Sequence, residues 1–209
     1  MCEALSPNRS VFDHEAGWIQ RPGFLSPAEI KARLLVCRGF LGLPSSKGRV
    51  GDKPTAGTHH LFELDDRSEF IEPLIGRTWL VEVVAEILGP SFERTQVSYR
   101  SPQPSFGGQR LHADDVPMLI PGPNSVATAI VALVPFTELN GATRLVPGSH
   151  RRPVLQGRSG ALGSHAEQVV LSGDAGTAFV FSGHVLHSGT PNFSAHERPA
   201  LQLVWRSKP

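Results

Sequence analysis

Apolar positions recur with two different periods along the chain, and the period changes near Pro90. Before this point, Ile30–Phe40 carries apolar residues at helical spacing. Ser26-Pro27-Ala28-Glu29, directly ahead of it, has the composition of a helix start with a capping box. A second helix is predicted over Pro73–Leu88, because Gly89-Pro90 is a strong stop signal. The N-terminal part is therefore predicted to be mainly helical.

The segment after Pro90 consists of short apolar runs separated by glycine and proline, a pattern typical of strands and turns. Thr95–Tyr99 alternates as a strand does, and Ser125–Phe136 is apolar and rich in β-branched residues, which indicates a buried strand. The remaining predicted strands are Thr143–Val146, Gln168–Leu171, Thr177–Phe181 and Ala200–Trp205. Helices followed by a block of short strands favour a mainly β jelly roll with an N-terminal helical layer. A split α+β domain with an open sheet is the alternative, and composition alone does not choose between them.

Length and charge narrow the class of protein. We expect one domain over residues 1–209, with a helical layer at about 24–90 and a jelly-roll core at about 91–206. The 20 Lys and Arg residues nearly balance the 19 Asp and Glu residues, so nothing favours nucleic acid or an anionic membrane as partner. No apolar run approaches the length that spans a bilayer. The sequence leaves the oligomeric state open.

The cysteines and the N-terminus favour a cytoplasmic location. Cys2 and Cys37 are the only cysteines, which argues against a disulfide framework and for a reducing compartment. Met1–Gly17 lacks the basic segment and apolar run of a secretory signal.

Two segments far apart in the sequence contain residue types that bind metals. Gln109–Asp115 follows a glycine-rich loop and contains His112 and Asp114, which point to the same side if the chain is extended there. A third ligand from a distant strand would complete a two-histidine, one-carboxylate triad, which holds Fe(II) and leaves coordination positions open. Alone, such a His-x-Asp pair is more often a polar pair at the end of a strand.

The second segment, Gly173–Arg206, brings His187 to the end of a strand and Arg198 to the start of the next apolar strand. A guanidinium at the edge of an apolar interior needs a partner, because an unpaired buried charge is costly. A dicarboxylate ligand would pair with it bidentately. The alternative is a salt bridge to Glu138 or Glu197.

In this order, the segments resemble the phytanoyl-CoA dioxygenase family of Fe(II)/2-oxoglutarate-dependent oxygenases. The resemblance covers about Thr95–Trp205 and includes the spacing of eleven residues between His187 and Arg198. Each motif is modest, but their order and spacing make the combination specific. The other matching segments are Gln109 with Leu111–Asp115, Asn140–His150 and Gly173-Asp174.

The resemblance implies a double-stranded β-helix, cupin-like, with His112, Asp114 and His187 as iron ligands. It implies a reaction that uses Fe(II), 2-oxoglutarate and O2, and that oxidises an unactivated C–H of a small apolar or amphipathic metabolite with release of succinate and CO2. Hydroxylation is the default outcome, and desaturation or ring chemistry is the alternative. The residues that it implies for 2-oxoglutarate are Arg198 for the distal carboxylate, with Gln109 and Thr143.

The substrate itself is not implied, since nothing in the sequence resembles a coenzyme A site. Met118–Ile120 are candidates for substrate contacts, and Lys47–Thr58 is a candidate lid. His184 competes with His187 as third ligand, but residues three apart in a strand face opposite sides, and the spacing to Arg198 favours His187. His150 follows Pro147-Gly148-Ser149 and is interpreted as a turn residue that makes local hydrogen bonds, with closure of the pocket rim as the alternative.

Two other classes of function stay open from the sequence. One is a cupin-like metal-dependent hydrolase or isomerase that does not use 2-oxoglutarate. The other is a non-catalytic jelly-roll binding module. The partner of Arg198 separates the first class from an oxygenase.

Overall fold

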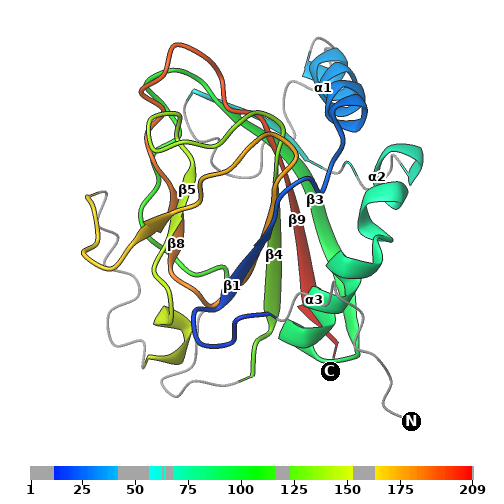
Figure 1. Cartoon of the computed structure of the whole chain (residues 1–209), viewed down its shortest axis with the longest axis vertical. Coiled ribbons are helices and arrows are strands. Elements are labelled where there is room, and N and C mark those ends of the chain that lie inside the picture. The colour runs from blue at the N-terminus through cyan, green and yellow to red at the C-terminus, as the bar shows by residue number, and fades with distance from the viewer. Residues whose placement is uncertain are drawn as a thin grey trace.

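A computed structural model of the protein describes residues 12–41, 57–62, 64, 68–115, 123–152 and 163–208. The candidate substrate contacts Met118–Ile120 lie outside these residues, as does the candidate lid Lys47–Thr58 except for its last two positions. The described chain forms two antiparallel sheets, and helices cover the outer side of the larger sheet (Figure 1).

The strands form a jelly roll of one large and one small sheet, so the predicted fold class is confirmed. The small sheet has the order β6 (Val169–Val170), β5 (Thr143–Leu145), β8 (His187–Gly189), and an isolated bridge joins His112 to its edge at His187. The large sheet has the order β1 (Trp18–Arg21), β7 (Ala178–Ser182), β4 (Val126–Ala132), β9 (Ala200–Ser207), β3 (Phe92–Pro102), β2 (Thr58–Leu61).

The first helix, α1 (Pro27–Leu41), begins at the predicted capping box. The backbone N–H of Ser26 donates to the carboxylate of Glu29 over 2.9 Å, and the N–H of Glu29 donates to the hydroxyl of Ser26 over 3.4 Å.

The single helix predicted over Pro73–Leu88 is wrong, because the chain forms α2 (Ser68–Ile75) and α3 (Thr78–Leu88) instead. Gly76, a weak helix former, follows α2, and Arg77 is extended with φ −66° and ψ 123°. The Arg77 guanidinium binds the Glu29 carboxylate and the carbonyl of Phe24, so the break ties α3 to the start of α1.

Two hydrophobic cores lie on the two faces of the large sheet. One lies between this sheet and the helices and includes Trp79, Leu80 and Tyr99. The other lies between the two sheets and includes Leu145 and Phe179. Every residue of β4 is buried, because both of its faces are covered.

Strands β1 and β2 were not predicted, because their segments WIQR and THHL are too polar to produce an apolar period. Both strands precede Pro90 and belong to the large sheet, so the N-terminal part contributes strands as well as the predicted helices. The prediction that His187 ends a strand is wrong, since β7 ends at Ser182 and His187 begins the separate three-residue strand β8. None of the described helices is long and apolar enough to cross a membrane.

Candidate metal centre and its cavity

The structure brings His112, Asp114 and His187 together, as the sequence predicted. Their candidate ligand atoms all lie within 4.8 Å of one another. His112 and His187 lie on two chain segments that are far apart in the sequence but adjacent in space. Their backbones pair through two N–H···O bonds of 3.0 and 2.8 Å. The ring centroids are 4.6 Å apart, and Nε2 of His187 lies 3.4 Å from Oδ1 of Asp114.

Backbone carbonyls fix the tautomer of both histidines. Nδ1 of His112 lies 2.8 Å from the carbonyl oxygen of Arg110, and Nδ1 of His187 lies 2.9 Å from that of Val185. Because a carbonyl only accepts, Nδ1 carries the hydrogen in each ring. Both Nε2 atoms are then left with a lone pair toward the carboxylate, as metal-binding histidines require.

Asp114 is held in place by its backbone and by its side chain. Its N–H donates to the carbonyl of Gly183 over 2.7 Å, and its Oδ2 accepts from the hydroxyl of Thr128 over 2.6 Å. Burial alone would raise the pKa of Asp114, but His187, Thr128 and His112 outweigh burial and lower the pKa to about 2. The carboxylate is therefore ionised at neutral pH, while Oδ1 faces the imidazoles.

The charges of the cluster of His112, Asp114 and His187 favour a bound cation. Burial lowers the pKa of His187, but the neighbouring Asp114 outweighs it, so the net shift is upward. A proton at Nε2 of His187 would satisfy the carboxylate, and a divalent metal bound by both groups would satisfy it better. The donor set, two imidazoles and one carboxylate, suits non-haem Fe(II).

Neither His184 nor His150 belongs to this cluster. His184 lies in a turn between β7 and β8, so the prediction that His184 and His187 share one strand is wrong, whereas the prediction that His187 joins His112 and Asp114 agrees with the geometry. Nε2 of His184 lies 2.8 Å from the hydroxyl of Ser125, which donates to Asp115 over 2.7 Å. His150 lies in a 3-10 turn, and its Nε2 is 3.2 Å from the carbonyl oxygen of His14.

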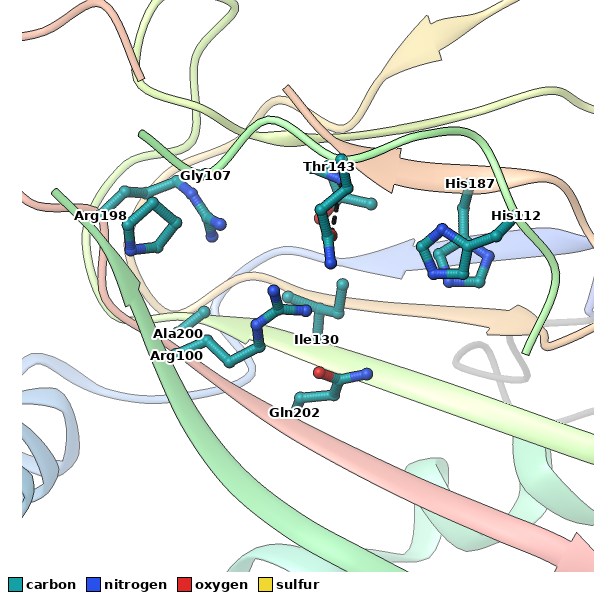
Figure 2. Close-up of a pocket in the computed structure, with 12 residues that line it drawn as sticks. Arg100, Gly107, His112, Ile130, Thr143, His187, Arg198, Ala200 and Gln202 are labelled. Carbon is teal, nitrogen blue, oxygen red and sulfur yellow. Dashed lines mark hydrogen bonds between the residues drawn. The ribbon is translucent and has the colours of Figure 1, made fainter. Parts of the chain in front are cut away.

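A cavity extends from the two histidines to Arg198 (Figure 2). The empty space between the lining residues is about 520 Å³, a volume that includes the open solvent at the mouth of the cavity. Both sheets supply the lining side chains. These are Arg100, Pro102, Gly107, Gln109, His112, Ile130, Thr143, His187, Gly189, Arg198, Ala200 and Gln202.

Arg198 is buried at the far end of this cavity, with 5% of its surface exposed. Its guanidinium stacks on the ring of Phe136 at 4.4 Å, and its Nε has no hydrogen-bond partner among the residues that the structure describes. Burial lowers the pKa of Arg198 to about 9, and the charge of Arg100 adds to the shift. Among the described residues no carboxylate forms an ion pair with Arg198, and Glu197 binds Arg38 over 2.9 Å instead. The predicted alternative of a salt bridge to Glu138 or Glu197 is therefore wrong, and this buried donor faces the cavity without a charged partner.

Gln109 and Thr143 line the same cavity. Oε1 of Gln109 accepts from the backbone N–H of Gly189 over 3.1 Å, which leaves its NH2 group to donate to a ligand. Thr143 begins β5 and is nearly fully buried.

Three polar side chains of the site were missed from the sequence: Arg100, Gln202 and Thr128. The strand predicted at Thr95–Tyr99 continues to Pro102, so Arg100 lies on the same face as Gln96 and Ser98. A run of polar residues at alternate positions, opposite the apolar Val97 and Tyr99, was available as a signal. Alternation of this kind usually marks a solvent-exposed face, and here that face lines a cavity.

Comparisons with known proteins agree with this geometry. A model of the phytanoyl-CoA dioxygenase family matches residues 14–200. The ectoine dioxygenase of Nocardia farcinica is 24% identical over 98% of this chain and 78% of its own length. The multifunctional dioxygenase prhA of Penicillium brasilianum is 36% identical over 50% of this chain and 38% of its own length. The chain covers only 26% to 49% of the length of several other curated relatives.

Solved structures share the fold at lower identity. The crystal structure of HygX from Streptomyces hygroscopicus, with nickel, 2-oxoglutarate and hygromycin B bound, superposes with a TM-score of 0.74. The match covers 93% of this chain and 84% of that chain, at 14% sequence identity.

Proposed function

The chain belongs to the phytanoyl-CoA dioxygenase family, and on that premise we propose that it is an Fe(II)/2-oxoglutarate-dependent oxygenase. Its metal ligands are His112, Asp114 and His187, and Arg198 binds the distal carboxylate of 2-oxoglutarate. The observation that carries this proposal is the buried guanidinium with a partnerless Nε in the same cavity as the three candidate ligands. A cupin-like hydrolase or isomerase has no need of a buried cation at this position.

The residues of the metal centre and its cavity suit both Fe(II) and 2-oxoglutarate. Two neutral imidazoles and one carboxylate are ligands that Fe(II) accepts while keeping positions open. Arg198 offers the fork of donors that matches a carboxylate. Gln109 and Thr143 line the same cavity and are proposed to donate hydrogen bonds to the co-substrate.

When bound, the iron supplies C–H oxidation by O2, coupled to conversion of 2-oxoglutarate into succinate and CO2. The balance is one substrate C–H, one O2 and one 2-oxoglutarate to one C–OH, one succinate and one CO2. The protein holds the two histidines in the tautomer that ligation needs, and Thr128 orients the carboxylate. Arg198 fixes the orientation of the diacid, and the apolar ring of Phe136 shields its guanidinium from water.

We propose hydroxylation of a small apolar or amphipathic metabolite as the reaction. Relatives with the names dioxygenase and ectoine dioxygenase support an oxidative reaction on a small molecule. The family name does not make a coenzyme A ester the substrate. We also propose that residues 1–209 form a single domain and that the protein is cytoplasmic. The buried, free thiol of Cys37 in α1 is compatible with a reducing compartment.

Binding of 2-oxoglutarate to the iron-loaded protein is measured first, and release of succinate is measured second. Iron-loaded protein under anaerobic conditions is expected to develop a weak visible charge-transfer band when 2-oxoglutarate is added, because the keto acid chelates the metal. Absence of this band in protein that demonstrably holds iron would contradict the proposal and favour the hydrolase or isomerase class. Admission of O2 should then release succinate, and a protein that binds 2-oxoglutarate but never releases succinate would be a binding module.

A further inference from the structure

Arg100 is a second arginine in the cavity, besides Arg198, to which the proposed function assigns the distal carboxylate of 2-oxoglutarate. Arg100 lies on the inner face of β3, where it pairs with Ala200 of β9. Figure 2 shows its guanidinium between Arg198 at one end and His112 and His187 at the other. No carboxylate within the described ranges forms an ion pair with Arg100.

The charges of the loaded site leave one positive charge without a partner. Arg100, Arg198 and a ferrous ion carry four positive charges between them, with the two histidines neutral as ligands. Asp114 and the dicarboxylate 2-oxoglutarate carry three negative charges. An uncompensated charge in a cavity of this kind is costly, and a single negative charge would remove that cost.

We propose that Arg100 binds a carboxylate of the primary substrate, so that the protein oxidises a small organic acid. This inference rests on the proposed function, and it narrows the substrate from an amphipathic metabolite to one with a carboxylate. A monoanion matches the single remaining charge, whereas a phosphate dianion would exceed it.

The surroundings of Arg100 suit such a ligand. Its neighbour on β9 is Ala200, whose small side chain leaves room for the guanidinium and for a group bound to it. Gln202, two residues further on the same face of β9, also lines the cavity. Its amide NH2 can donate to the second oxygen of a carboxylate. Ile130, which pairs with Gln202 across β4 and β9, provides apolar contact for the carbon skeleton.

The test compares Arg100→Met, which removes the charge at similar length, with Arg100→Lys, which keeps it. Arg152→Met is the matched control, because Arg152 lies on the surface and pairs with Glu167. Each protein is loaded with iron under anaerobic conditions and titrated with 2-oxoglutarate through the charge-transfer band. A wild-type protein that fails this first titration contradicts the proposed function, independently of Arg100.

The ternary complexes are then titrated with matched probe pairs of small carboxylic acids and their carboxamides, and binding is measured by ligand-observed NMR. We expect the wild-type protein and Arg152→Met to bind at least one acid about tenfold or more tightly than its amide. Arg100→Met should lose this preference while its 2-oxoglutarate affinity changes less than about threefold, and Arg100→Lys should keep part of it. Succinate release stimulated by the same acid should follow the binding preference.

Three results would overturn the inference. The first is a wild-type protein that binds 2-oxoglutarate but shows no preference for any acid over its amide. The second is an Arg100→Met variant that keeps the preference. The third is an Arg100→Met variant whose main defect is a loss of 2-oxoglutarate affinity, which would assign Arg100 to the co-substrate.

Discussion

The hydroxyl of Thr128 donates a hydrogen bond of 2.6 Å to Oδ2 of Asp114. Thr128 is completely buried at the centre of β4, whereas Asp114 belongs to a bend outside the regular strands. This bond therefore ties the carboxylate to a fully buried inner strand of the large sheet. It also occupies one carboxylate oxygen, so that Oδ1 is the oxygen that faces His187.

Replacement of Thr128 by Val should weaken metal binding without removing a ligand. The two side chains have nearly the same shape, but Val has no donor for Oδ2, so the carboxylate is free to rotate. Loss of such a supporting hydrogen bond typically lowers metal affinity by about 10- to 100-fold. Competition with a chromophoric chelator would measure the affinity for Fe(II) or Co(II). Thr128→Ser keeps the hydroxyl and should stay close to wild type, and equal affinity of the Val variant would show that the bond has no orienting role.

Arg198 is expected to determine the affinity for 2-oxoglutarate. Arg198→Met removes a bidentate, charge-assisted pair in a buried site, which should weaken 2-oxoglutarate binding by roughly 100-fold. Arg198→Lys keeps the charge but not the fork of donors, so an intermediate affinity is expected. The charge-transfer titration measures both. Metal affinity without 2-oxoglutarate is the internal control, because Arg198 stands at the other end of the cavity; an Arg198→Met variant with normal 2-oxoglutarate affinity would contradict the assignment.

Gly183 is required because there is no space for a side chain. A Cβ at this position would lie 2.7 Å from the Cβ of Val126 and 3.2 Å from the Cβ of Asp114. Gly183→Ala should therefore displace the backbone that holds Asp114, lower the free energy of unfolding by about 1–3 kcal/mol, and weaken metal binding as well.

Gly39 of α1 is the matched control for this prediction. A Cβ there meets nothing within 4 Å, so Gly39→Ala should stabilise the protein by roughly 0.5–1 kcal/mol through a better helix propensity. Chemical denaturation of both variants measures the two changes. A Gly183→Ala variant as stable as Gly39→Ala would mean that the contact with Val126 relaxes without strain.

The sequence was sufficient for the parts of the site that depend on residue type and spacing. His112 and Asp114 are two residues apart, and His187 and Arg198 belong to one segment, so local geometry already favoured their placement. The relation of His187 to His112 is a long-range bridge between segments about 75 residues apart, and only the resemblance to a family could suggest it.

Other features depended on contacts that the sequence does not display. At the break between α2 and α3, Gly76 is a weak local signal, but the ion pair of Arg77 with Glu29 joins residues far apart in the sequence, and no local pattern encodes it. Arg100 was overlooked because polar residues at alternate positions of a strand are usually solvent-exposed. Whether such a face meets solvent or a cavity depends on the second sheet, whose strand β8 has only three residues and no apolar period.

We expect His60 in β2 to make the stability of the fold depend on pH. Its Nε2 is buried with no hydrogen-bond partner among the described residues, and burial together with the charge of Arg100 lowers its pKa to about 3. In the unfolded chain the imidazole titrates near its usual value of about 6.5. Below that pH the unfolded state binds a proton that the folded state does not, so the free energy of unfolding falls as the pH falls from 6.5 toward 3. The contribution is at most about 1.4 kcal/mol per pH unit.

His60→Leu should abolish this contribution, because a neutral side chain binds no proton in either state. We expect the difference in free energy of unfolding between His60→Leu and wild type to shift in favour of the variant by about 1–2 kcal/mol between pH 6.5 and pH 5. Urea denaturation at each pH measures it. His59→Leu removes the exposed neighbouring imidazole and should keep the wild-type pH dependence. Parallel curves for wild type and His60→Leu over this range would mean that His60 is protonated within the fold, and that β2 opens locally to allow it.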